Sequence, residues 1–193
     1  MSEKLIRTFI SVSVPKEIVV IKERLKSTLD SKGTRIRWVR DGNMHLTLKF
    51  IGSTTEEYVD SINNKLATLV KPSTSISLSL SGTGCFPNKG RANTLWVGVN
   101  GELDKLEKLI LNINSKLEPL GFPIEKREFS PHVTIARINS NQKKKPDISN
   151  FLNTTFIELP MRIVKINLMQ SESFPKGSFY TILGTHFLGT KLE

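Results

Sequence analysis

The chain has 193 residues, 38% of them hydrophobic and 24% charged, which is typical of a folded globular protein and not of a disordered one. No apolar run reaches the roughly 18–20 residues that a membrane-spanning helix needs, and no small-residue cleavage site follows the apolar stretch 5–14. A single cysteine, Cys85, excludes an internal disulfide framework and a zinc site built from cysteines. We therefore expect one cytoplasmic domain over 1–193 that does not contact a membrane.

The charge balance is strongly basic, with 28 Lys and Arg against 18 Asp and Glu and a formal net charge of +10. Such an excess favours a polyanionic partner, and nucleic acid is the usual one. A solvated basic surface accounts for the same charge equally well, so the composition suggests a partner and identifies no chemistry.

Strand-like and helix-like patterns alternate along the first half. Alternating apolar residues predict strands, apolar residues at helical spacing predict helices, and Gly33 stands where a helix commonly ends. We expect strands over 5–14, 35–40 and 44–51, a turn at 41–42, and helices over 16–32 and 56–70.

The second half repeats the alternation, with one long helix closed by Gly121 and a polar loop that carries Lys143, Lys144 and Lys145. That loop is either a mobile surface segment or an RNA contact. We expect strands over 73–81, 94–99, 129–138, 162–169 and 179–183, a helix over 103–120, a Gly-rich connection over 82–87, and the loop over 139–146. The whole indicates an α+β fold, with two similar lobes.

Two of the three histidines occur in matching tetrapeptides, His-Leu-Thr-Leu from His45 and His-Val-Thr-Ile from His132. The copies stand 87 positions apart, close to half the chain, which indicates an internal duplication. Side chains alternate across a strand, so each copy would show an imidazole and a hydroxyl about 6.5–7 Å apart on one face and turn its apolar residues to the core. Related by a pseudo-twofold axis, the two faces would surround one small group.

Two imidazoles and two hydroxyls suit displacement at phosphorus. One neutral histidine can deprotonate the nucleophile, a cationic one can protonate the leaving oxygen, and the hydroxyls of Thr47 and Thr134 can hold the other oxygens. Without a carboxylate at ligand spacing the set is a poor metal site, so we expect neither a metal nor another cofactor.

Further candidates depend on local strand geometry. Strict alternation places Arg137 with Val133 and Ile135, so it reaches the phosphate only if the strand ends or bulges there. Lys49 shares the face of His45 by alternation, and could touch the anion or remain solvated. Phe86 and Trp96 could stack on a nucleobase or belong to the core, whereas the third histidine, His186, lacks the threonine and is expected at the surface or in packing.

These motifs resemble the two-histidine phosphoesterases, and specifically the RNA 2′,3′-cyclic phosphodiesterases, historically called 2′-5′ RNA ligases. The resemblance covers nearly the whole chain, without departure at a motif position. Its matching segments are 7–10, 37–39, 43–52, 84–87, 95–99, 129–137, 170–172 and 177–180.

The resemblance implies a bilobal α+β fold with an antiparallel sheet in each lobe, flanking helices, and the active site in the central cleft. It implies hydrolysis of a terminal 2′,3′-cyclic phosphate of RNA, or of a nucleotide, to a 2′-phosphate. His45 would be the proton donor to the departing O3′, His132 the proton acceptor that activates water, and Thr47 and Thr134 the phosphate ligands. The pseudo-symmetry of the two motifs cannot itself distinguish donor from acceptor.

Two other functions stay open: 2′-5′ ligation of RNA by the same histidines in exchanged roles, and a module that binds RNA ends without catalysis. A monomer is expected.

Overall fold

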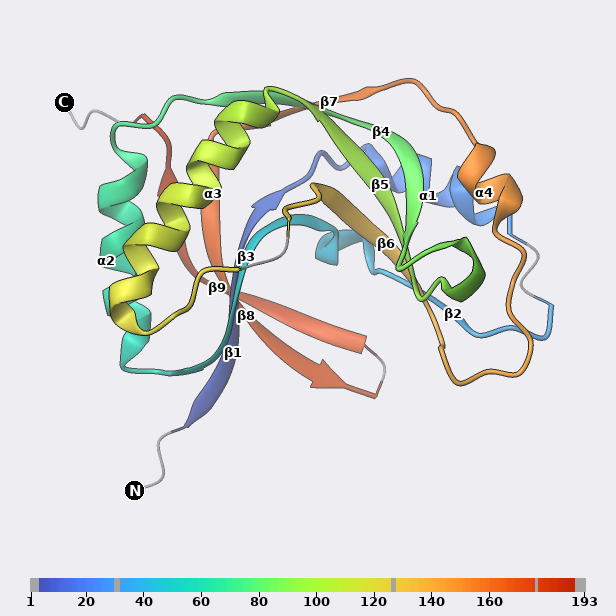
Figure 1. The fold of residues 1–193 in the computed structure, drawn as a ribbon, viewed down its shortest axis with the longest axis horizontal. Coiled ribbons are helices and arrows are strands. Elements are labelled where there is room, and N and C mark those ends of the chain that lie inside the picture. The colour runs from blue at the N-terminus through green and yellow to red at the C-terminus, as the bar shows by residue number, and fades with distance from the viewer. Residues whose placement is uncertain (1–3, 30–31, 126–127, 176, 190–193) are drawn as a thin grey trace.

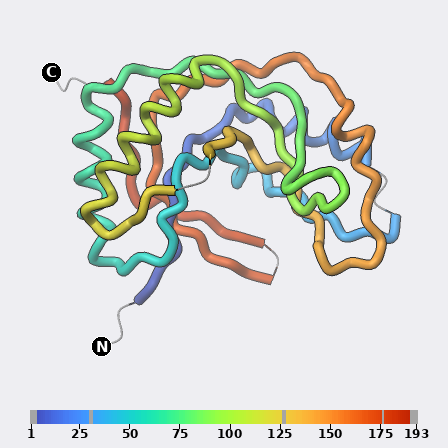
Figure 2. Tube along the Cα trace, viewed as in Figure 1, coloured from blue at the N-terminus to red at the C-terminus, as the bar shows by residue number. Residues whose placement is uncertain are grey.

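The computed structural model describes residues 4–29, 32–125, 128–175 and 177–189, which form a strongly curled antiparallel sheet with helices packed on it (Figures 1 and 2). The strands are β1 (Leu5–Ser13), β2 (Ile36–Trp38), β3 (His45–Thr55), β4 (Ile76–Phe86), β5 (Thr94–Gly101), β6 (His132–Ile138), β7 (Leu159–Ile163), β8 (Lys165–Phe174) and β9 (Gly177–Phe187). The helices are α1 (Ile18–Lys26), α2 (Tyr58–Val70), α3 (Leu103–Leu117) and α4 (Ser149–Asn153), with 3₁₀ turns η1 (Asp41–Asn43), η2 (Lys89–Arg91) and η3 (Glu118–Leu120).

The sheet has the same layout on either side of its centre. Its order is β7-β4-β5-β6-β3-β1-β8-β9, with β2 added to β6, so the two motif strands β3 and β6 are the middle pair. The ladder between them has a single residue pair, Leu46 with Val133. We expected one sheet in each lobe; instead one sheet continues through this pair, because the first apolar residues of both motifs meet there.

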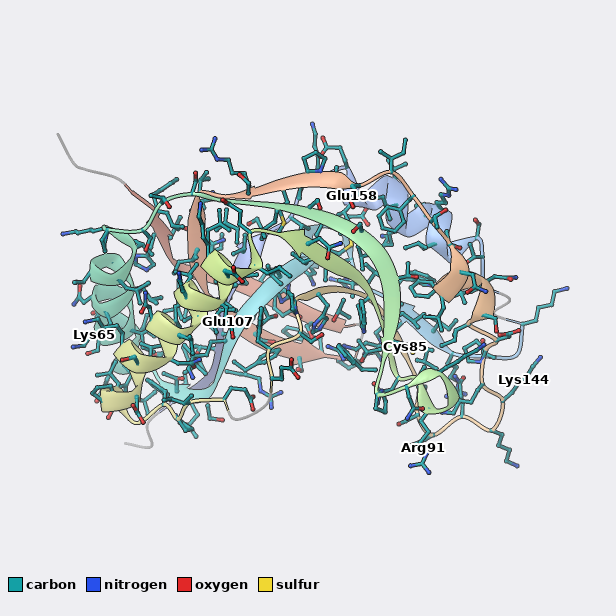
Figure 3. The ribbon with its side chains drawn as sticks, turned by 45° about the horizontal axis from the view of Figure 1, so that its top comes forward. Lys65, Cys85, Arg91, Glu107, Lys144 and Glu158 are labelled. Atoms are coloured by element: carbon teal, nitrogen blue, oxygen red, sulfur yellow. The ribbon has the colours of Figure 1, made fainter. Side chains whose placement is uncertain are left out.

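Two helices pack against the half of the sheet that belongs to the other part of the chain. α2 and α3 pack on each other and both contact β3, although α3 follows β5 of the other half. α1 follows β1 and yet lies near α4 at the opposite end of the molecule, where α4 packs on β4 (Figures 1 and 3). The two lobes therefore exchange a helix, which ties them together.

The core confirms the alternation of the motif strands. Leu46, Leu48, Val133 and Ile135 are all less than 5% exposed and belong to the apolar cluster between sheet and helices. Their polar neighbours in the motifs stand on the other face of the sheet, away from the helices.

Several predicted element bounds are wrong, each for a tertiary reason. The single strand over 162–169 is two strands that break at Val164, because β7 pairs with β4 and β8 with β1 at opposite sides of the sheet. Residues 82–86 of the predicted connection belong to β4, because pairing with β5 continues through them. Helix α1 ends at Lys26, so Gly33 (φ +73°) forms a later turn and not the helix end.

In the described part of the chain, none of the helices combines the length and the apolar character needed to cross a membrane.

Close packing at the β4–β5 pair gives a test of the fold. Gly84 pairs with Trp96, and a Cβ at position 84 would lie 2.1 Å from the Trp96 Cζ2 atom. We expect Gly84→Ala to lower the free energy of unfolding by about 1–3 kcal/mol, because the indole must move. Urea denaturation measures this. Gly42→Ala is the control, since a Cβ there meets nothing within 4 Å; equal stability of the two variants would contradict the packing.

Candidate active site

The two motifs meet at the centre of the sheet and line one cavity. Because Leu46 pairs with Val133 in antiparallel register, His45 falls opposite Thr134, and Thr47 falls opposite His132. The histidines are then diagonal neighbours, a relation that in a regular ladder spans about 7–8 Å. All four side chains line a cavity of 630 Å³, so the structure brings together the residues that the motifs singled out.

Each imidazole is oriented by a hydrogen bond to the backbone carbonyl two residues before it. Nδ1 of His45 lies 2.8 Å from the carbonyl oxygen of Asn43, and Nδ1 of His132 lies 2.7 Å from that of Ser130. A carbonyl can only accept, so Nδ1 carries the proton and donates it. The other nitrogen, Nε2, is therefore a bare acceptor in the neutral ring and a donor in the cation. Either role in a proton transfer is open to each ring.

Aromatic rings surround each imidazole. His45 contacts Phe9 and Tyr180, with ring centroids 4.9 and 5.3 Å apart. His132 contacts Phe86 at 4.9 Å and Trp96 at 6.1 Å. Each imidazole is therefore packed between two aromatic rings.

These surroundings change the acidity of both histidines. Burial lowers the pKa of His45 and of His132, and the Arg137 charge lowers both further. The hydrogen bonds to the Asn43 and Ser130 carbonyls act in the opposite direction. A charge on His132 also lowers the pKa of His45, so the pair disfavours double protonation.

A β-bulge at the same position of each motif decides which way the next residues of the strand point. In β3 the register against β1 skips Leu48, and in β6 the register against β5 skips Ile135. Each bulge sets two consecutive residues on the helix side, and the next residue returns to the cavity side. Lys49 is therefore buried, whereas Phe50, next along β3, lines the cavity.

The bulges determine on which side of the sheet Arg137 and Lys49 lie. Arg137 follows the bulge in β6 and lines the cavity, where its guanidinium also donates to the Thr94 hydroxyl at 3.3 Å. The face expected for Lys49 is wrong: its ammonium points to the helix side and donates to Asn114 Oδ1 at 2.6 Å and to the Pro123 carbonyl at 2.7 Å. Burial lowers the pKa of Lys49, which acts as a link between β3 and α3.

The remaining candidates divide between the cavity and the rest of the molecule. Phe86 lines the cavity, whereas Trp96 stands behind it against Gly84 and His132. His186 is only partly buried and bonds Asn63 Oδ1 at 2.9 Å through Nε2.

The lysine loop is folded onto neighbouring backbone. Lys144 donates to the Lys32 carbonyl, and Lys145 to the carbonyls of Asn139 and Ser140. Neither ammonium faces the cavity.

The sequence reasoning missed one wall of the cavity. It is formed by the β8–β9 hairpin and β1, with Ser171, Ser173, Ser178, Tyr180 and Arg7. The Asn43 amide donates to the Ser178 carbonyl at 2.8 Å, which ties this hairpin to the residues just before His45. The two residues are 135 positions apart in the sequence, so no local pattern predicts their contact. The only signal was the family resemblance, whose matching segments include 7–10 and 177–180.

Among the described residues, no three His, Cys, Asp or Glu side chains are grouped closely enough to hold a metal ion.

Comparison with known proteins shows the family. The model of the LigT-like phosphoesterases matches this chain twice, over residues 11–96 and 97–180. The chain belongs to this family. A relative from Aquifex aeolicus, named RNA 2′,3′-cyclic phosphodiesterase, is 30% identical over 191 residues, which are 96% of this chain and 99% of that one. Another of that name, from Aeropyrum pernix, is 31% identical over 83% of this chain and 90% of its own.

Solved structures show that the LigT-like fold is shared. The protein TT0787 of Thermus thermophilus superposes with a TM-score of 0.78 at 25% identity, over 96% of this chain and 99% of that one. LigT of Escherichia coli complexed with 3′-AMP superposes with a TM-score of 0.76 at 21% identity, over 97% and 100%. The expected α+β fold with two repeated halves is thereby confirmed.

Titration of the histidines tests the electrostatics of this LigT-like site. We expect both ring pKa values below the ordinary value of about 6.5, and Arg137→Gln should raise both, because removal of a positive charge favours the cation. NMR titration of the imidazole resonances measures this. His186 is an internal control, since burial accounts for its lowered pKa. An equal shift of His186, or none at His45 and His132, would contradict the assignment.

Proposed function

We propose that this chain hydrolyses the 2′,3′-cyclic phosphate at the end of RNA to a 2′-phosphate, without a metal, with His45 and His132 as the acid–base pair. The observation that carries the proposal is the cavity itself, where two oriented imidazoles and two hydroxyls from opposite halves face the same space. The relatives named RNA 2′,3′-cyclic phosphodiesterase support the choice of substrate.

In the proposed reaction a water molecule attacks phosphorus in line with the bond to O3′. Nε2 of neutral His132 accepts the proton of that water, and Nε2–H of cationic His45 donates a proton to the departing O3′. The bond from phosphorus to the water oxygen forms as the bond to O3′ breaks, and the product carries a 2′-phosphate. We assign donor and acceptor from the family resemblance, because the two rings are held alike.

We propose that the two rings share one proton when the substrate is bound. Each positive charge nearby disfavours a second one, so one charged ring leaves the other neutral. A bound anionic phosphate raises the pKa of the rings that it touches, so that one ring takes up a proton from solvent and can act as the acid. The acid–base pair is thus completed by the substrate.

Three further side chains are proposed to bind the phosphate. The attacking and departing oxygens lie along the diagonal between the histidines, and the hydroxyls of Thr47 and Thr134, on the other diagonal, donate to the non-bridging oxygens. Arg137 adds a positive charge that the bulge in β6 returns to the cavity side. Both histidine motifs that line the cavity belong to one chain, and we propose that residues 1–193 act as a monomeric unit.

Incubation with adenosine 2′,3′-cyclic phosphate in the presence of EDTA tests this proposal. We expect turnover to the 2′-phosphate, with a loss of about 10²–10⁴-fold in kcat for His45→Ala and for His132→Ala, because each removes a proton-transfer partner. His186→Ala is the matched control and should keep the activity. Circular dichroism checks that the variants fold.

Three other outcomes of this experiment would contradict the proposal. Tight binding of the cyclic nucleotide without product would contradict hydrolysis and favour an RNA-end-binding module. Faster joining of two RNA ends than hydrolysis would favour the ligase. Near-wild-type kcat in either histidine variant would contradict the acid–base pair.

A further inference from the structure

Two arginines stand directly opposite each other on neighbouring strands. Arg37 of β2 pairs with Arg137 of β6, and opposite residues of an antiparallel pair project to the same face. Like charges in this position are destabilising. Within the described ranges no carboxylate lies within salt-bridge distance of Arg35, Arg37 or Arg137. Among the described residues, these three arginines thus form a cluster of positive charge beside the cavity without a carboxylate partner.

The arginines of this cluster lie on the cavity side of the sheet. Val39, two residues after Arg37, lines the cavity, and its amide continues the β2–β6 ladder with a 2.9 Å hydrogen bond to the Ile135 carbonyl. Ile36, Trp38 and Val39 all pack on the apolar core, so the side on which Arg37 lies follows from its pairing with Arg137, which lines the cavity. Alternation puts Arg35 on the same face as Arg37, and both are exposed to solvent.

Along β2, Val39 lines the cavity, and Arg37 and then Arg35 lie progressively farther from it. This strand pairs only with β6 in the described sheet and so has no strand partner at its other edge. The Arg35 amide donates to Gln142 Oε1, which brings the lysine-bearing loop 139–146 next to the far end of this strand. Figure 3 shows Lys144 and Arg91 at the same end of the molecule.

We propose that Arg37 and Arg35 bind the phosphates of the nucleotides that precede the reacting end of a single-stranded RNA. The inference rests on the proposed function and narrows its substrate class to RNA oligonucleotides in preference to free cyclic nucleotides. We call the pair Arg37 and Arg35 the arginine track.

The chemistry of the substrate fits the arginine track. A cyclic phosphate ends an RNA strand, so a strand with its end in the cavity must leave along the surface next to it. Residues at i and i+2 of a strand are about 6.5–7 Å apart, which suits successive phosphates of an extended chain. Guanidinium groups bind phosphate through paired hydrogen bonds, and positively charged tracks are the general means of holding single strands.

Comparison of two substrates with the same reacting end tests the inference. One is adenosine 2′,3′-cyclic phosphate; the other is an RNA octamer that ends in it. The ratio of kcat/KM for the octamer to kcat/KM for the mononucleotide should fall about tenfold in Arg37→Gln, and further in Arg35→Gln/Arg37→Gln. The matched control is Arg24→Gln, which removes the same charge from the exposed side of α1 and should leave the ratio at its wild-type value.

The salt dependence of binding gives a second readout. For single strands the slope of log K against log salt is about 0.7 per neutralised phosphate, so Arg37→Gln should reduce it by about that amount. An unchanged ratio in the double variant, or an equal fall in Arg24→Gln, would overturn the arginine track.

Failure of the proposed function gives a different result. Then the wild-type chain would turn over neither substrate, and binding of the same octamer with a 2′-phosphate end, compared among the same variants, would still test the arginine track.

Discussion

One residue pair, Leu46 with Val133, is the contact on which the candidate site depends. It joins the two halves of the sheet at the first apolar residue of each motif, and both side chains are buried beneath it. Because the pairing is antiparallel, the flanking residues are set as two histidines on one diagonal and two threonines on the other. A slip of one residue between β3 and β6 would turn the histidine and threonine of one motif to the helix side and its apolar residues away from the core, so the apolar core fixes the register of the site.

The repeated bulge then makes the two halves chemically different. Beyond Leu48 and Ile135 each strand buries one further residue, Lys49 in one half and Ala136 in the other, and then returns to the cavity. The returning residues are Phe50 and Arg137. At equivalent positions of the pseudo-symmetric motif strands, the cavity is thus lined by the ring of Phe50 on one side and by the cation of Arg137 on the other.

The sequence predicted the site best where the information is local. Alternation correctly placed His45, Thr47, His132 and Thr134 on one face, because the pleat of a strand needs only neighbouring residues. It misplaced Lys49 and left Arg137 open, because a bulge depends on the register against β1 and β5. The exchanged helices, the continuous sheet and the hairpin wall with Tyr180 arise from contacts between distant segments, which no local pattern contains.

The most direct test of this account is a crystal structure with a nucleoside 2′-phosphate bound. The account predicts a phosphorus atom between the two histidines, with each Nε2 at hydrogen-bond distance, about 2.7–3.2 Å, from a different phosphate oxygen, and with both threonine hydroxyls on the remaining oxygens. A phosphate bound outside the cavity, or one in contact with a single imidazole, would contradict it.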